Sequence, residues 1–242
     1  MIDPSIRPER TGICQNTSRG PDHLKTLTLL SILLCASGLS KDLRAQPTVI
    51  VHPSLEDTSG TSAWTFDGSG VWNISGGMLV LSKAGVPSGP IRRPAALAIL
   101  QSYDFVNVTV QAQIRSTAPL DVPRRDLDVI LDYESPSRFY YVHLAGITDP
   151  VHNGIFLVAD ADRRRIDDGT GKPQLTDQNW HSVRVERNAA TGRIAVYSDS
   201  LRTAVFTAAD TTLHGGRVGF GSFDDTGEFR GILITGSPRE IK

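Results

Sequence analysis

The sequence predicts an all-β fold, a two-sheet antiparallel jelly-roll sandwich, over residues 46–242. From Pro47 onward, apolar residues recur with a period of two, which is typical of half-buried strands. Gly, Pro, Asp and Asn separate these runs at near-regular intervals, as turns do between the short strands of a sandwich. No helix-like apolar spacing and no internal linker interrupt this region, so we expect one domain.

The strands are predicted from their alternation. In residues 106–114, five apolar side chains alternate with four polar ones, which predicts a strand with one buried face and one solvent-exposed face. Turn residues such as Gly76-Gly77, Ser135-Pro136 and Thr191-Gly192 bound the other runs. These further predicted strands cover residues 78–81, 127–133, 139–145, 155–159, 180–187, 193–198, 204–207, 217–223 and 229–235.

The first 45 residues are expected to lie outside the sandwich. The stretch "LKTLTLLSILLCASG" at residues 24–38 places one lysine before an apolar run and small residues after it, as a secretory signal peptide does. We therefore predict an N-terminal extension with a signal peptide over residues 1–45, and a secreted or periplasmic mature protein. The run is shorter than the roughly 20 residues that span a bilayer, so we expect no transmembrane segment in the mature chain.

The cysteine and charge content limits the chemistry and the partners expected of the mature chain. Both cysteines, Cys14 and Cys35, fall in the part that the signal peptide would remove. The mature chain would then hold no disulfide, no thiolate nucleophile and no zinc–sulfur site. The formal net charge is −1 and the arginines are scattered, so no clustered basic face is available for nucleic acid.

The candidate site lies in "DLDVILDYESPSRFYYVHLAG", residues 126–146, which predicts two adjacent strands joined by a short loop. If Tyr133 pairs with Arg138, Asp128 lies opposite His143. The same register places Ile130 opposite Tyr141 and Asp132 opposite Phe139. A slip by one residue would put His143 among the leucines of the other face, so the hydrophobic pattern favours this register.

This register predicts a polar and aromatic face on one side of the sheet. Its members are Asp126, Asp128, Asp132, Phe139, Tyr141 and His143. Aromatic rings stack on the C–H faces of sugars, and carboxylate and imidazole groups hydrogen-bond to hydroxyls. Three interpretations stay open at this point: a saccharide-contacting face, a solvated face without a ligand, and a Ca²⁺ site built from the carboxylates.

Two neighbouring segments could border this face. The loop of residues 149–154 could bring His152 and Asn153 over it, although a single loop histidine is often incidental. Arg163 begins a run of three arginines at the end of a predicted strand. It could clamp a carboxylate such as that of a uronic acid, or pair with neighbouring aspartates in solvent.

Five motifs follow one another along the chain: "GVWNISGGML" at residues 70–79, "FYYVHL" at 139–144, "WHSVRV" at 180–185, "GRIAVYSD" at 192–199 and "GRVGFGSFDD" at 216–225. This series, over roughly residues 64–235, resembles the concanavalin A-like, laminin-G-like jelly rolls. In particular it resembles the bacterial secreted 3-keto-disaccharide hydrolase-type domain family. The resemblance implies a concave sheet that binds or cleaves saccharides. Glycosidases of this fold often carry a Glu-x-Asp-x-x-Glu strand, whereas residues 126–132 contain no glutamate.

The leading hypothesis is therefore an exported jelly roll that binds a saccharide or polysaccharide on the predicted face, with no cofactor apart from the Ca²⁺ alternative. A glycan-cleaving enzyme, either a 3-keto-glycoside hydrolase or a polysaccharide lyase, is a second hypothesis. There His143 would act as acid or base, Asp128 would orient it, and Tyr141 would donate a proton or stack. The substrate contacts would be Asp126, Asp132, Phe139, His152, Asn153 and Arg163. A non-catalytic adhesive or structural envelope domain is the third hypothesis.

Overall fold

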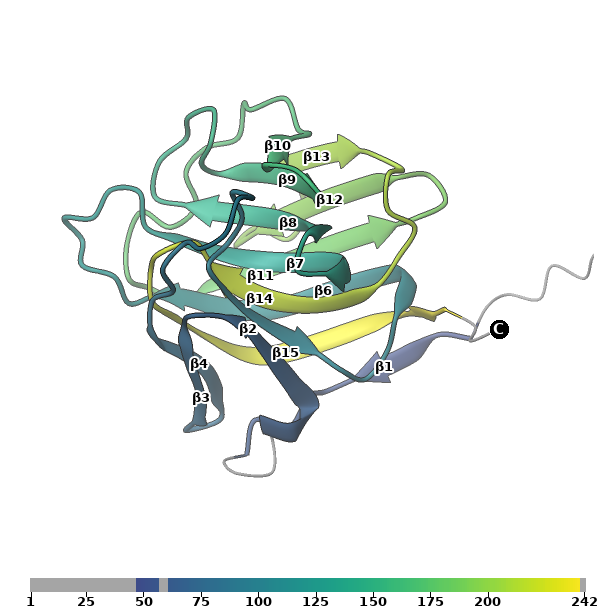
Figure 1. Cartoon of the computed structure of the whole chain (residues 1–242), viewed down its shortest axis with the longest axis horizontal. Helices are drawn as coiled ribbons and strands as arrows, with labels where there is room; N and C mark the ends of the chain where they lie inside the picture. The colour runs from purple at the N-terminus through teal and green to yellow at the C-terminus, as the bar shows by residue number, and fades with distance from the viewer. Residues whose placement is uncertain (1–46, 57–60, 240–242) are drawn as a thin grey trace, which may run out of the picture. The chain divides into compact units, whose positions relative to one another are not determined.

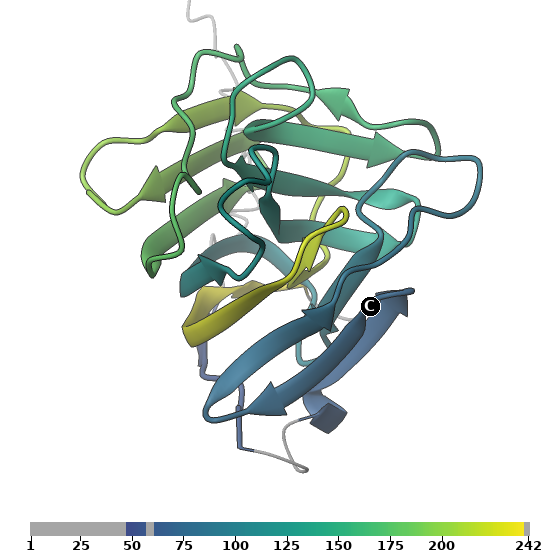
Figure 2. The same ribbon diagram turned by 90° about the vertical axis from the view of Figure 1, so that its left-hand side faces the viewer.

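The computed structural model describes residues 47–56 and 61–239, which all belong to the compact unit Arg44–Lys242. Two antiparallel sheets lie face to face in this unit (Figures 1 and 2). The predicted all-β sandwich is thus confirmed for these residues. The predicted signal peptide lies outside the described residues.

Sheet A contains eight strands in the order β13-β12-β11-β6-β15-β4-β3, and β1 adds to it by pairing with β15. All of these pairs are antiparallel, including β6 with β11 and β6 with β15, whose strands are far apart along the chain. The strand bounds are β1 (Val49–Val51), β3 (Val71–Ser75), β4 (Met78–Lys83), β6 (Phe105–Ser116), β11 (His181–Asn188), β12 (Arg193–Ser198), β13 (Phe206–Ala209) and β15 (Gly227–Pro238).

Sheet B contains seven strands in the order β10-β9-β8-β7-β14-β5-β2, and Figure 1 shows β9, β8 and β7 side by side. A short 3₁₀ helix, η1 (Thr61–Ala63), precedes its edge strand. The strand bounds are β2 (Trp64–Gly68), β5 (Ala96–Leu100), β7 (Asp126–Ser135), β8 (Arg138–Ala145), β9 (Gly154–Ala159), β10 (Arg164–Arg165) and β14 (Arg217–Ser222).

The main hydrophobic core fills the space between the two sheets. Alternate residues supply it, for example Val108 and Val110 on β6 and Leu127 and Val129 on β7. Burial of such side chains contributes roughly 1.5–3 kcal/mol each relative to exposure. The period of two seen in the sequence is the signature of this packing.

A second hydrophobic cluster covers the other side of sheet B, the face that points away from sheet A. Its nine buried members are Leu97, Ile99, Ile130, Tyr133, Phe139, Tyr141, Phe156, Val158 and Phe223. Sheet B is therefore apolar on both faces, and β5 reads "ALAIL" with every residue buried. Such a strand has no alternation, which is why the sequence pattern did not predict it.

A glycine on β14 lets the side chain of the neighbouring strand pack directly against the backbone of this second face. Gly221 on β14 pairs with Leu97 on one side and Asp128 on the other. A Cβ at Gly221 would lie 2.8 Å from Leu97 Cδ2 and 2.9 Å from the Ala96 carbonyl oxygen. The side chain of the neighbouring strand thus leans over the glycine, which matches the close approach that a glycine inside a strand indicates.

Candidate functional site

The β7–β8 hairpin positions the predicted pair Asp128 and His143. The two residues are cross-strand partners, and so are Ile130 and Tyr141, which confirms this part of the predicted register. His143 Nδ1 lies 2.9 Å from Asp128 Oδ1 and 3.6 Å from Asp126 Oδ2. The register and the two short distances make a carboxylate–imidazole pair with a second carboxylate beside it.

The pair is not on a solvated surface. His143 and Asp126 are each 1% exposed, and Asp128 and Tyr141 are fully buried. The solvated face, one of the three interpretations left open by the sequence, is wrong, because the strands on either side bring the second hydrophobic cluster onto the same face. A pattern read from two strands alone contains no information about what their neighbours place over them.

Aromatic rings enclose His143 on several sides. Its ring meets those of Phe223, Phe156 and Tyr141 edge-on, with centroids 5.4, 6.0 and 6.0 Å away. Edge-to-face contacts at these distances are favourable, and the rings exclude water from the imidazole. Phe156 and Phe223 were not predicted as site residues, since they reach the pair from β9 and from the turn after β14.

Burial sets the charge of this cluster. It lowers the pKa of His143 to about 4; nearby Asp126 opposes this effect and the Arg163 charge reinforces it. Burial also raises the pKa of Asp126 and of Asp128 well above the ordinary value, and for Asp128 the Arg163 charge partly opposes that rise. The His143 imidazole is therefore neutral near pH 7, and a hydrogen bond of 2.9 Å joins its Nδ1 to Asp128 Oδ1, with the donor set by the tautomer.

Three buried polar atoms of this cluster have no hydrogen-bond partner among the described residues. They are Asp128 Oδ2, His143 Nε2 and Arg163 Nε. Buried polar atoms are nearly always paired, so such atoms require an explanation. An acceptor and a guanidinium donor lie here next to a neutral imidazole, which can accept or donate according to its tautomer.

Arg163 covers the cluster from the turn between β9 and β10. Its guanidinium Cζ lies 4.1 Å from the Phe223 ring centroid, and Nη1 donates to the Tyr141 hydroxyl over 3.1 Å. Its backbone N–H donates to the carbonyl oxygen of Arg92 over 3.1 Å. Among the described residues Arg163 forms no ion pair, and its charge rests mainly on aromatic faces. The pairing with aspartates that the run of arginines suggested holds for Arg164, which pairs with Asp210, and for Arg165, which pairs with Asp167.

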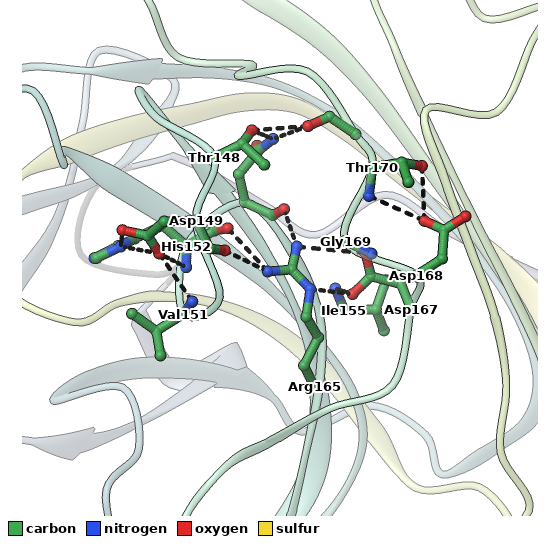
Figure 3. A network of polar contacts seen from close by, with 12 residues as sticks. Thr148, Asp149, Val151, His152, Ile155, Arg165, Asp167, Asp168, Gly169 and Thr170 are labelled. Atoms are coloured by element: carbon green, nitrogen blue, oxygen red, sulfur yellow. Dashed lines mark hydrogen bonds and ion pairs between the residues drawn. The ribbon is translucent and has the colours of Figure 1, made fainter.

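His152 lies beside His143, as predicted, with ring centroids 5.6 Å apart. Its Nδ1 is 2.8 Å from Asp149 Oδ1, and the Asp149 carboxylate also accepts the backbone N–H of Val151 over 2.8 Å. Figure 3 shows how Arg165 fixes this loop: Nη1 donates to the Asp149 carbonyl oxygen over 2.5 Å, and Nε donates to Asp167 over 3.0 Å. The loop thus holds a second, half-buried carboxylate–imidazole pair above the first.

Asn153 does not hang over the site, which corrects the prediction. It is fully buried with a φ of 58°, and its side chain turns inward. Its Nδ2 donates to Thr148 Oγ1 over 2.8 Å and to the Lys172 carbonyl oxygen over 2.6 Å. Asparagine tolerates this left-handed backbone and caps the loop, so the residue is structural.

The prediction also placed Asp132 on the wrong face of sheet B. The β7–β8 register shifts after Leu131, and Asp132 adopts a φ of 48°, so its side chain turns to the inner face of sheet B. There its Oδ2 accepts a hydrogen bond of 2.8 Å from Arg187 Nε of sheet A. The bulge moves Tyr133 onto the outer face in its place, where it joins the second cluster.

Phe139 lies on the predicted face but cannot meet a ligand. It is fully buried, and its ring lies 5.8 Å from that of Tyr133 and 6.1 Å from that of Tyr141. Its role as a stacking surface for a substrate is corrected to a packing role.

Asp126 belongs to two groups that could hold a metal ion, one with Asp128 and His143, the other with Asp224 and Asp225; within each group the candidate ligand atoms lie within 4.8 Å of one another. Only the second group is all-carboxylate, as Ca²⁺ prefers. However, Asp126 Oδ2 already accepts the Phe223 N–H over 2.9 Å, and Asp225 Oδ2 accepts the Asp126 N–H over 2.9 Å. Three carboxylates supply the six oxygens of a minimal Ca²⁺ site only if each binds through both oxygens, and two of these oxygens already accept backbone hydrogen bonds, so the fit is incomplete.

The chain is similar in structure to several lectins. The acidic lectin of winged bean, complexed with methyl-α-D-galactose, shares 13% identity and a TM-score of 0.54, over 80% of this chain and 100% of that one. Lectin I of Ulex europaeus, in complex with the methyl glycoside of α-L-fucose, shares 13% identity and a TM-score of 0.51, over 78% and 97%. The basic winged bean lectin with Tn-antigen shares 14% identity and a TM-score of 0.52, over 80% and 100%.

These likenesses show the fold. The protein is a concanavalin A-like jelly-roll sandwich, as the sequence resemblance implied. The sequence matches no protein-family profile, so the resemblance to the 3-keto-disaccharide hydrolase-type family stays a prediction. No curated protein matches it either. Within the described residues, no helix has the length and apolar character needed to cross a membrane.

Proposed function

We propose that the protein binds a saccharide on the outer face of sheet B, above the Asp128–His143 pair. The observation that carries this proposal is the set of three buried atoms without partners, Asp128 Oδ2, His143 Nε2 and Arg163 Nε. Each buried polar group left unpaired costs about 1–3 kcal/mol. A ligand that pairs with them recovers this cost on binding.

A sugar hydroxyl suits these atoms because it both donates and accepts. It can donate to the free Asp128 oxygen and accept from the Arg163 Nε–H, and His143 Nε2 can take either role according to its tautomer. The rings of Phe223 and Phe156 supply apolar faces for sugar C–H groups. The lectins that share this fold are named with bound sugars, which makes sugars the first class to test.

Ligand access requires the cover over His143 to move. Arg163 is held by a hydrogen bond to Tyr141, a backbone hydrogen bond to Arg92 and contacts with two phenylalanine rings. None of these is an ion pair, and each hydrogen bond contributes about 0.5–1.5 kcal/mol, so contacts with a ligand can replace them. Arg163 and the half-buried His152 would then become the rim of the opened site.

Glycan cleavage is a second candidate, supported by the neutral charge state of His143. An imidazole with its Nδ1 bonded to Asp128 and its Nε2 free has the arrangement of a general base. Burial raises the pKa of Tyr141 well above its usual value, and its hydroxyl already accepts from Arg163. Tyr141 would therefore serve as a proton donor and not as the base of a lyase.

We also propose that the protein is exported. The mature chain of residues 46–242 would meet its glycan in the periplasm or outside the cell, after loss of the predicted signal peptide. The signal-like segment at residues 24–38 supports this location.

The test is a binding screen of the full chain on an oligosaccharide array, followed by calorimetry and a reducing-end assay, with and without Ca²⁺. His143→Gln and Arg163→Gln should weaken binding at least tenfold. His181→Gln is the matched control, because His181 is a buried histidine of sheet A that is bonded to Asp177 and Asp199. A blank array with a folded chain would sink the proposal and assign the unpaired atoms to ordered water. Release of reducing ends that is lost in His143→Gln would favour the enzyme.

A further inference from the structure

A polar groove lies on the outer face of sheet A, on the opposite side of the sandwich from His143. Its volume is about 360 Å³, and β6, β11, β12 and β15 line it together with Thr48. This volume falls within the range of roughly 300–1,000 Å³ found for small-molecule sites. Sheet A has no second hydrophobic cluster on this face among the described residues, so the groove is open where sheet B is covered.

The strand register arranges the groove in two rows. Thr235, Thr109 and Glu186 are consecutive cross-strand partners on β15, β6 and β11. The next row, in the same register and two residues away, contains Ser237, Asn107 and Asn188. Cross-strand partners point to one side of a sheet, and adjacent strands are about 4.8 Å apart. The groove thus presents hydroxyl and amide groups at regular intervals across three strands.

The charges of the groove are already compensated. Glu186 Oε1 lies 3.1 Å from Arg184 Nε, and its Oε2 lies 3.5 Å from Arg193 Nη1. The Tyr197 hydroxyl donates to the same carboxylate over 3.3 Å. A charged ligand would have to break these pairs, so the groove favours a neutral one.

Several neutral side chains of the groove are free, although Asn188 Oδ1 already accepts hydrogen bonds from the backbone N–H and the hydroxyl of Thr191. The hydroxyls of Thr109, Thr235 and Ser237 form no hydrogen bond with any described residue, and Asn107 Oδ1 is buried without a partner. A protein partner would need an apolar centre in its interface, which this lining does not offer. A compact molecule covered with hydroxyls matches the free donors and acceptors.

We infer that this groove is a second binding site for a neutral saccharide, contacted by Thr109, Thr235 and Asn107. The choice of ligand class rests on the proposed function, whereas the site itself is separate from the His143 cluster. Two sites on opposite faces would let one molecule contact two glycan chains, and weak binding at each would add through avidity.

The experiment is an NMR titration of the ¹⁵N-labelled full chain with maltose, cellobiose and lactose. Saturable amide shifts at Asn107, Thr109, Glu186 and Thr235 are expected with at least one of them. Thr109→Val keeps the shape of the side chain and removes its hydroxyl. It should weaken the affinity for the groove about fivefold, the effect of losing one hydrogen bond. Thr203→Val, which removes an exposed hydroxyl outside the groove lining, should leave the affinity unchanged.

The outcomes separate this inference from the proposed function. Groove shifts that persist in His143→Gln and weaken in Thr109→Val support the second site. Shifts confined to the surroundings of His143 and Arg163 would overturn it and leave the proposed function standing. Shifts in the groove alone would overturn the proposed site on sheet B and keep the groove. No shift anywhere in a well-folded chain would count against both.

Discussion

Asp132 and Arg187 form an ion pair between the two sheets, with Arg187 Nε 2.8 Å from Asp132 Oδ2 and both side chains almost fully buried. Arg187 also donates to the carbonyl oxygens of Gly192, Asp210 and Leu213, over 2.6, 2.9 and 2.7 Å. Its Cζ lies 4.7 Å from the Tyr140 ring centroid. One guanidinium thus ties β7 of sheet B to three loop carbonyls around sheet A.

Arg187→Met is expected to destabilise the fold strongly. It leaves a buried carboxyl and three carbonyls without their donor, and breaking a buried pair of this kind costs about 3–5 kcal/mol. Urea unfolding followed by circular dichroism measures the loss. The control is Arg193→Met on the adjacent strand β12, where the arginine side chain is 54% exposed and the change should stay within about 0.5 kcal/mol. Equal effects of the two variants would contradict the structural role of Arg187.

The sequence predicted the fold and half of the site for physical reasons. The alternation of apolar and polar residues identifies which side of each strand faces the core. It therefore predicted the sandwich and the register that pairs Asp128 with His143. It cannot report a change of direction inside a strand, and the bulge at Asp132 reverses the side chains that follow. Nor can it report burial by distant strands, so Phe156 and Phe223 were missed, and Arg163 was predicted as a residue bordering the face and not as its cover. The run "SFDD" before the closing strand is a visible signal for Phe223, although in the sequence it served only as part of the motif at residues 216–225 that resembles other jelly rolls.

His143 is expected to stay neutral down to unusually low pH. Burial lowers its pKa to about 4 from the ordinary 6.5, so below pH 6.5 the unfolded chain binds more protons than the folded one. The stability that His143 contributes is therefore present above pH 6.5 and is lost as the pH falls toward about 4. His143→Gln should reduce the loss of stability between pH 7 and pH 5, as measured by urea unfolding at each pH. A His143 ring signal that titrates near pH 6.5 by NMR would refute the assignment.

Removing the Arg163 side chain should expose the His143 cluster. In the native chain His143 is 1% exposed, so diethyl pyrocarbonate should modify it much more slowly than the half-buried His152. Arg163→Ala removes the cover over Phe223 and should raise the rate of modification of His143 several-fold in peptide mass mapping. Arg164→Ala is the control, because the neighbouring side chain is 61% exposed and pairs with Asp210 instead. Unchanged reactivity of His143 in Arg163→Ala would show that other residues form the cover.

Asp225 and Asp224 are adjacent, yet their substitution should have unequal effects. Asp225 Oδ2 accepts the buried N–H of Asp126, whereas Asp224 is exposed. Burial raises the pKa of Asp225, and the charge of Asp224 adds to that rise. Asp225→Ala leaves that N–H unpaired and should cost about 1–3 kcal/mol. Asp224→Ala removes a like charge from the cluster and should be neutral or slightly stabilising. Thermal unfolding of the two variants decides the point, and a greater loss in Asp224→Ala would contradict the assignment.

Gly221→Ala should disturb the outer face of sheet B without touching any predicted ligand contact. Its Cβ would lie 2.8 Å from Leu97 Cδ2 and 2.9 Å from the Ala96 carbonyl oxygen, so β5 must shift relative to β14. Overpacking of this kind costs typically 1–3 kcal/mol. The double variant Gly221→Ala, Leu97→Ala removes the side chain that meets the new methyl, but not the carbonyl. A loss smaller than the sum of the two single variants is therefore expected in chemical unfolding. Strict additivity would show that the backbone contact, and not the leaning Leu97 side chain, requires glycine on β14.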